Sequence, residues 1–206
     1  MSTLKECRIL RVLQQTSAAE AIKESFDIEQ ENTYQVVDDK GQEMYFATEH
    51  EEHGFFFKSF LNSARPFTIT VQPKSSKHGI RVKRPFRFYF HEASVELLDG
   101  RPLGTIKKRF TILNRKYSIL DPKGQEKFLL SGPLWKPWTF NIEQKGEKIG
   151  VLTKDWSGLI KETLTEADNF SLKFPRQLNP VFKLLLLGSV FLIDFVHFEK
   201  SPNQKS

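Results

Sequence analysis

Cysteine, tyrosine and tryptophan are scarce in this chain, whereas phenylalanine is abundant. The 206 residues include one cysteine, Cys7, which excludes an internal disulfide framework and fits a reducing compartment. Only 4 Tyr and 3 Trp accompany 19 Phe. Lys5, Glu6 and Arg8 interrupt any apolar stretch near the beginning, so we expect no secretory signal peptide. These scarcities indicate an intracellular protein that folds without disulfides.

Motifs for bond-making chemistry are also missing. The sequence contains no glycine loop of the phosphate-binding kind, no nucleophile elbow and no paired catalytic carboxylates. We therefore expect a protein that is not an enzyme. The net charge of +6 favours anionic partners, either acidic lipid or nucleic acid. Basic clusters at residues 81–87 and 107–109 fit phosphoinositide headgroups or nucleic acid, or form a solvated face of a sheet.

One long uncharged run occurs, from Leu184 to Ile193, and it is bracketed by Lys183 and Asp194. Ten residues make roughly 15 Å of helix, whereas a bilayer span needs about 20 mostly apolar residues. An asparagine that can cap the helix precedes Pro180, which suits the first helical position. We interpret residues 180–198 as a helix buried by the rest of the chain, in preference to a single membrane span.

The preceding two thirds of the chain alternates apolar and polar residues in short runs. Hairpins are predicted with turns at Asp99-Gly100, Pro122-Lys123-Gly124 and Lys145-Gly146, whereas residues 1–32 fit either a strand or a short helix. Eleven to thirteen strand candidates indicate a closed barrel or a sandwich. A large barrel needs a filling, and a barrel around a central helix is a known solution. The helix at 180–198 is therefore predicted to fill the barrel.

Two hairpin types each occur twice. Residues 36–47 resemble residues 119–130, with a shared Lys-Gly-Gln-Glu after an acidic turn, and residues 95–106 resemble residues 140–152 more loosely. The repetition suggests a duplicated half-barrel. The alternative is that hairpins of one turn type resemble each other by chance.

Several separated segments together resemble the phospholipid scramblase family. They are YQVVDDKGQEMYFATE, SARPFTITV, LLSGP, KDWSGLIKETLTEADNFSLKFP (154–175) and LLLLGSVFLIDFVHFE (184–199), and they occur in the order of the family. The resemblance covers about residues 26–199 and implies the mainly β, tubby-like fold: a closed twelve-stranded antiparallel barrel around a hydrophobic C-terminal helix. Residues 1–25 are then an N-terminal extension or the first strands, 26–200 the barrel with its helix, and 201–206 a polar tail.

The resemblance implies a function at membranes. Family members move phospholipids between bilayer leaflets without ATP and in response to calcium. We therefore expect a peripheral protein on the cytoplasmic face of an anionic phospholipid membrane, with partner proteins as further candidates. The alternative is a tubby-like lipid- or protein-binding module that translocates nothing, and nucleic-acid binding is a weaker third interpretation.

The calcium segment that the resemblance implies falls on residues 166–177. Glu166 and Asp168 match the first and third ligand positions, whereas Gln177 stands where the family has an acid. Two carboxylates predict only weak calcium binding. The alternative is a strand that begins at Asn169 and turns its alternating apolar residues toward the core.

Three loops that carry palmitoylated cysteines in animal scramblases contain none here. These loops correspond to about residues 50–61, 86–91 and 134–138, and they hold aromatic and basic residues instead. The hypothesis is a reversible aromatic and basic contact with anionic membrane. Its residues are Phe55, Phe56, Phe57, Lys58, Arg84, Arg87, Trp135 and Trp138. The alternative is that these aromatic residues fill a wide barrel.

Overall fold

The computed structural model describes residues 4–15, 30–50, 65–73, 78–86, 89–155 and 169–198. Within these ranges the chain forms twelve strands and one long helix, α3 (Pro180–His197). The strands are β1 (Ile9–Gln15), β2 (Gln30–Val37), β3 (Glu43–His50), β4 (Phe67–Gln72), β5 (Ile80–Arg84), β6 (Glu92–Leu97), β7 (Pro102–Arg109), β8 (Asn114–Leu120), β9 (Glu126–Pro133), β10 (Thr139–Gln144), β11 (Glu147–Asp155) and β12 (Asn169–Lys173).

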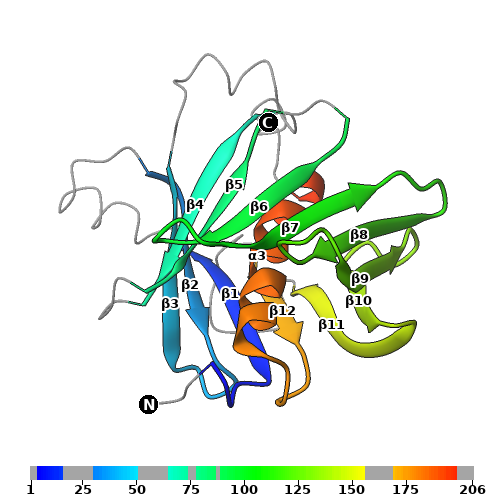
Figure 1. Cartoon of the computed structure of the whole chain (residues 1–206). Coiled ribbons are helices and arrows are strands. Elements are labelled where there is room, and N and C mark those ends of the chain that lie inside the picture. The colour runs from blue at the N-terminus through cyan, green and yellow to red at the C-terminus, as the bar shows by residue number, and fades with distance from the viewer. Residues whose placement is uncertain are drawn as a thin grey trace, which may run out of the picture.

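The strands form one closed antiparallel barrel. Each strand pairs with its neighbours in sequence, and β1 pairs with β12 in a register that joins Ile9 to Lys173, so that the described sheet has no open edge. A barrel this wide needs a filling, and α3 runs through its middle (Figure 1). The predicted barrel of twelve strands around a C-terminal helix is confirmed. Because β1 lies before residue 26, the N-terminal segment supplies the first strand.

Alternation along each strand separates the inside of the barrel from the outside. In β5 the buried positions are Ile80, Val82 and Arg84, and in β3 they include Ala47 and Glu49. Apolar side chains at such positions pack on α3, and the hydrophobic effect of burying them drives closure. Arg84 and Glu49 are polar residues at inward positions and therefore need partners inside the barrel.

Helix α3 begins where the sequence predicts. The Asn179 side chain accepts a hydrogen bond from the Val181 amide at 2.9 Å, and Pro180 occupies the first turn. It is long and apolar enough to cross a membrane, yet 67% of its residues are buried inside the barrel. At Gly188 an added Cβ would lie 2.9 Å from the Val95 side chain of β6, so the helix touches the wall there. The interpretation of this segment as a core helix is confirmed.

The first repeated hairpin type has the same geometry in both copies. Asp38 and Asp121 each accept hydrogen bonds from the amides two and four residues later, and Gly41 and Gly124 both have φ of 77°. These copies, β2–β3 and β8–β9, are six strands apart, as a duplicated half-barrel requires. The looser pair, β6–β7 and β10–β11, is four strands apart and does not fit the same duplication.

The two ends of the barrel differ. The connections β5–β6, β7–β8 and β9–β10 lie at the end where α3 finishes, which we call the loop end. The tight turns β2–β3, β6–β7, β8–β9 and β10–β11 lie at the other end, beside residue 8 and the start of α3, which we call the turn end. In Figure 1 the loop end is uppermost.

Candidate membrane interface

Exposed apolar side chains gather at the loop end. Among the described residues, ten large apolar side chains are exposed, and nine of them belong to three loop-end connections. The nine, here called the apolar rim, are Phe86, Tyr89, Phe90, Phe110, Ile112, Leu113, Leu134, Trp135 and Trp138. Tyr89 is 86% exposed and Phe110 87% exposed. The tenth, Val181, is at the turn end. Large exposed apolar side chains gathered at one end of a protein are typical of a surface for a membrane or a partner.

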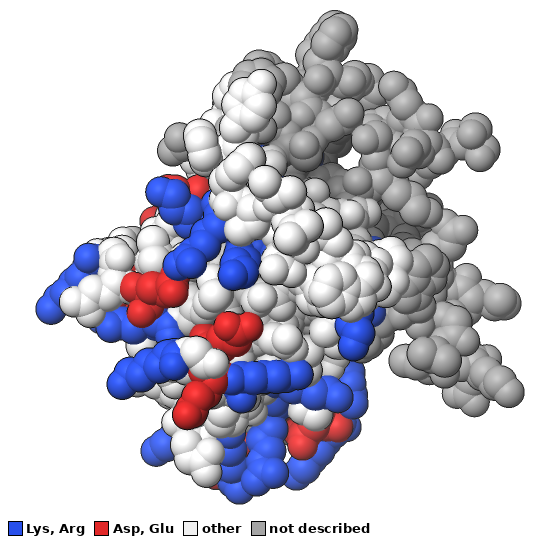
Figure 2. Space-filling model, turned by 90° about the vertical axis from the view of Figure 1, so that its right-hand side faces the viewer, with Lys and Arg blue, Asp and Glu red and all other residues white. Residues whose placement is uncertain are grey.

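Charged side chains lie mainly away from the apolar rim. In the face shown in Figure 2, the described lysine, arginine and carboxylate side chains cover mainly the lower part, which is the turn end and the wall, whereas the described side chains of the upper part are mostly uncharged. Ion pairs lie along the outer wall, for example Glu96 with Arg81 at 3.0 Å and with Lys83 at 2.7 Å. The wall and the turn end therefore suit water, and the loop end suits an apolar medium.

Arg115 holds the loop that carries the two tryptophans of the rim. Its guanidinium donates to the carbonyls of Pro137 at 2.6 Å and Lys136 at 2.9 Å, and it lies 4.4 Å from the Phe140 ring centroid. Burial lowers the pKa of Arg115, but arginine stays charged at any physiological pH. Trp138 is thereby positioned on α3, where it stacks on Phe198 with ring centroids 5.4 Å apart.

The connection between β7 and β8 contributes three rim residues that sequence analysis missed. Phe110, Ile112 and Leu113 are 87%, 79% and 73% exposed. In the sequence, Phe-Thr-Ile-Leu continues the second strand of the hairpin predicted to turn at Asp99-Gly100, and no glycine or proline marks an end of that strand. The available signal was its position directly after Lys107 to Arg109, because an apolar group next to basic residues is typical of a membrane-surface segment.

Three of the eight predicted lipid-facing residues lie within the described part of the chain. Trp135 and Trp138 lie in the rim, 76% and 36% exposed. Phe55, Phe56, Phe57, Lys58 and Arg87 lie outside the described residues. The strands that precede and follow residues 51–64, β3 and β4, have their connected ends at the loop end.

Arg84 is a correction, because it is 2% exposed and points into the barrel. Its guanidinium and that of Arg65 both lie 4.6 Å from the Phe195 ring centroid of α3. One of its terminal nitrogens donates to the Arg65 carbonyl, and the other donates to His91 Nδ1 at 2.7 Å. The prediction that Arg84 faces lipid headgroups is therefore wrong. The alternation of β5 turns residue 84 inward, together with residues 80 and 82.

Cations surround the C-terminal turn of α3 below the rim. Arg65 pairs with the buried Glu49 at 2.5 Å, and Lys154 Nζ lies 4.3 Å from the Phe198 ring centroid. The C-terminus of a helix carries partial negative charge, which nearby cations stabilise. Burial, helped by neighbouring cations, lowers the pKa of His91 to about 4 and that of His197 to about 3. Both imidazoles are therefore neutral at pH 7.

The calcium segment is a strand over most of its described part. β12 pairs with β1 and with β11, and its Phe170 and Leu172 are buried, as the strand interpretation predicts. Gln177 is exposed beyond the strand, and Glu166 and Asp168 lie outside the described residues. A twelve-residue loop around calcium does not fit a segment whose middle is paired on both sides. Among the described residues, no group of three His, Cys, Asp or Glu is placed to hold a metal ion.

A closed barrel with a buried helix and one apolar end defines a β-barrel protein suited to a membrane surface. The chain belongs to the Scramblase family, whose model matches residues 1–200. It is 28% identical to phospholipid scramblase 2 of Homo sapiens over an alignment of 212 positions that covers 96% of this chain and 70% of that protein.

Other relatives are similarly distant. Phospholipid scramblase 1 of Mus musculus is 27% identical over 191 residues, covering 86% of this chain and 58% of that protein. Phospholipid scramblase family member 5 of Homo sapiens is 28% identical over 187 residues, covering 84% of this chain and 68% of that protein. The chain thus spans between 58% and 70% of the length of these relatives. No solved structure matches the chain significantly.

Proposed function

We propose that this protein binds the cytoplasmic leaflet of anionic membranes through the apolar rim and moves phospholipids between leaflets without ATP. The observation that carries the proposal is the gathering of nine exposed apolar side chains at one end of a barrel whose relatives are named phospholipid scramblases. The proposed activity makes and breaks no covalent bond.

The rim supplies enough apolar surface for reversible membrane attachment. Fully burying one large apolar side chain contributes about 1.5–3 kcal/mol, and insertion at the interface recovers part of this for each rim residue. Lys136, exposed between Trp135 and Trp138, lies at the level where anionic headgroups would meet the rim. Membrane attachment therefore needs no acyl chain on these loops.

A second candidate is a tubby-like lipid- or protein-binding module without translocation activity. The position of α3 favours it, because α3 fills the barrel and leaves the polar headgroup no hydrophilic path across about 30 Å of hydrocarbon. Translocation by the first candidate would need several chains to assemble, or the bilayer beside the rim to thin.

We further propose that calcium has little effect. Only Glu166 and Asp168 match carboxylate positions of the family segment, and the residues after them form β12. The segment offers too few carboxylate oxygen ligands to bind calcium tightly.

Flotation with anionic vesicles tests the membrane interface. The variant with Phe110→Ser, Ile112→Ser and Leu113→Ser should bind at least about tenfold more weakly, because each lost side chain removes inserted apolar area. The matched control is Val181→Ser, which removes an exposed apolar side chain at the turn end. If the triple variant floats as well as wild type, the rim is not the membrane contact.

A fluorescent-lipid assay distinguishes the two candidates. In vesicles that carry labelled phospholipid in both leaflets, dithionite quenches the outer leaflet alone unless lipid is translocated. Translocation by wild type, in calcium and in chelator alike, supports the first candidate. Flotation without translocation supports the binding module, and a strong requirement for calcium contradicts the calcium proposal.

A further inference from the structure

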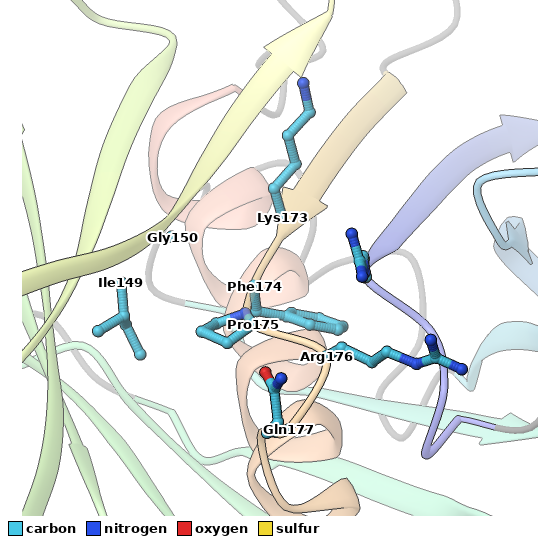
Figure 3. A pocket seen from close by; sticks show the side chains of 8 residues that line it. Ile149, Gly150, Lys173, Phe174, Pro175, Arg176 and Gln177 are labelled. Atoms are coloured by element: carbon cyan, nitrogen blue, oxygen red, sulfur yellow. The ribbon is translucent and has the colours of Figure 1, made fainter.

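A cleft of about 440 Å³ opens at the turn end, opposite the apolar rim. Its walls come from the beginning of β11, from the segment that follows β12, and from residue 8 just before β1. Figure 3 shows Ile149 and Arg176 on opposite sides of Pro175, with Gln177 below. The volume is within the range of sites that bind small organic ligands.

The polar lining of this cleft is cationic. Arg8, Lys173 and Arg176 line it together with the neutral amide of Gln177, and no carboxylate is among the described lining residues. A nearby acid, Glu6, lies 3.8 Å from Arg176, and both side chains are at least half exposed. An ion pair that is this exposed to water contributes little to stability, so an anionic ligand can displace Glu6 from Arg176.

Lys183 ties together the two backbone segments that carry Arg8 and Arg176. Its ammonium group is 0% exposed and donates to the carbonyls of Leu4, Lys5 and Cys7 on one side, at 3.0, 3.0 and 2.7 Å. On the other side it donates to the carbonyl of Arg176 at 2.9 Å. The backbone on each side is thus held in place before any ligand arrives, and the buried positive charge adds to the attraction for an anion.

We propose that this cleft binds a small soluble organic polyphosphate. The cations come from two segments, Arg8 before β1 and Lys173 with Arg176 at the end of β12, and this arrangement suits a ligand with more than one phosphate. Arginine suits phosphate oxygens because its donors form a planar fork. Ile149 and Pro175 provide an apolar surface for the carbon skeleton. A soluble ligand is chosen over a lipid headgroup because the cleft is at the end away from the rim, and this choice rests on the proposed membrane orientation.

Titration calorimetry of the full chain with inositol hexakisphosphate, near 0.15 M salt, tests the proposal. The cleft variant carries Lys173→Glu and Arg176→Glu. The control variant carries Lys40→Glu and Lys123→Glu, which make the same charge change in exposed turns at the same end. Because the cleft variant replaces two phosphate-binding cations by carboxylates, it should bind at least about tenfold more weakly than the control.

Three results would overturn the proposal: no binding by wild type, unchanged binding by the cleft variant, or an equal loss in the control, which would show unspecific attraction. Flotation with vesicles that contain phosphatidylinositol bisphosphate distinguishes the source of the phosphate. The cleft variant should float like wild type, and its failure to float would assign the cleft to a lipid headgroup. The variant with Phe110→Ser, Ile112→Ser and Leu113→Ser should lose flotation and keep hexakisphosphate binding. The membrane proposal and the cleft proposal can therefore fail independently of each other.

Discussion

Lys183 shows how a charge can sit inside an apolar barrel. Its stem lies within the barrel, and its ammonium group meets four backbone carbonyls that would otherwise need water. Burial lowers the pKa of Lys183. Sequence analysis treated this lysine only as one boundary of the apolar run. That it joins the N-terminal segment to α3 follows from contacts across more than 170 residues, and no local pattern contains that information.

Replacing Lys183 by methionine should destabilise the fold. The change keeps the stem but leaves the buried carbonyl of Cys7 and three partly buried carbonyls without their charged donor, so we expect the free energy of unfolding to fall by about 3 kcal/mol. Urea denaturation followed by circular dichroism measures this change. The matched control, Lys123→Met in an exposed turn, should change it by less than about 0.5 kcal/mol. Equal stability of Lys183→Met and wild type would show that water replaces the ammonium group.

The buried histidines predict a loss of stability in mild acid. The pKa values of His91 and His197 in the folded state, about 4 and about 3, lie below the ordinary value of 6.5, so the unfolded chain binds more protons below that pH. Their contribution is fully present at pH 7 and falls as the pH drops through 6.5 toward 4. At pH 5 the contribution of each histidine to the free energy of unfolding should be about 2 kcal/mol smaller than at pH 7.

Urea denaturation at pH 7 and pH 5 checks this expectation. In His91→Gln the side-chain amide can still accept a hydrogen bond from Arg84 but does not titrate. The difference in free energy of unfolding between pH 7 and pH 5 should therefore shrink by about 2 kcal/mol. An unchanged difference would mean that His91 is protonated in the folded protein.

At the scale of elements, the close approach of α3 to the wall depends on Gly188. A Cβ at this position would meet Val95 at 2.9 Å and the tips of Ile106 and Val82 at 3.4 Å. Gly188→Leu should lower the free energy of unfolding by about 1–3 kcal/mol through overpacking, although leucine is the better helix former. Thermal unfolding compares it with Val181→Leu, the same product at an exposed position of α3, which should be near neutral. A stabilised Gly188→Leu would mean that helix and wall separate readily.

The loops show where element prediction succeeds and where it fails. Hairpin turns at residues 99–100, 122–124 and 145–146 follow from turn residues whose backbone preference is local, and the structure has turns at each of them. The loop at Phe110 has no such residue, and its sequence is compatible with a strand. The ends of β7 and β8 are set by the pairing between these two strands, which leaves the apolar residues between them exposed.

At the scale of the whole molecule, the barrel separates an apolar end from a charged end. Helix α3 packs on the inner wall along most of its length, so releasing it would leave the lumen unfilled. We therefore expect α3 to stay inside when the rim binds a membrane.

Cysteine labelling on vesicles checks this arrangement in a Cys7→Ser background. Leu187→Cys, at a position that is 0% exposed, should resist a water-soluble maleimide with and without anionic vesicles. Phe110→Cys, at a position that is 87% exposed, should react in solution and become protected on vesicles. Labelling of Leu187→Cys on vesicles would instead show that α3 leaves the barrel.

The sequence by itself determined the strands, their turns, the start of α3 and the need to bury it, because alternation, turn residues and helix caps act over a few residues. The inward position of Arg84, the bonds of Lys183 and the gathering of three loops into one rim were decided only by the tertiary structure. The physical reason is closure: pairing β1 with β12 brings distant loops to one end and sets which polar side chains must find partners inside.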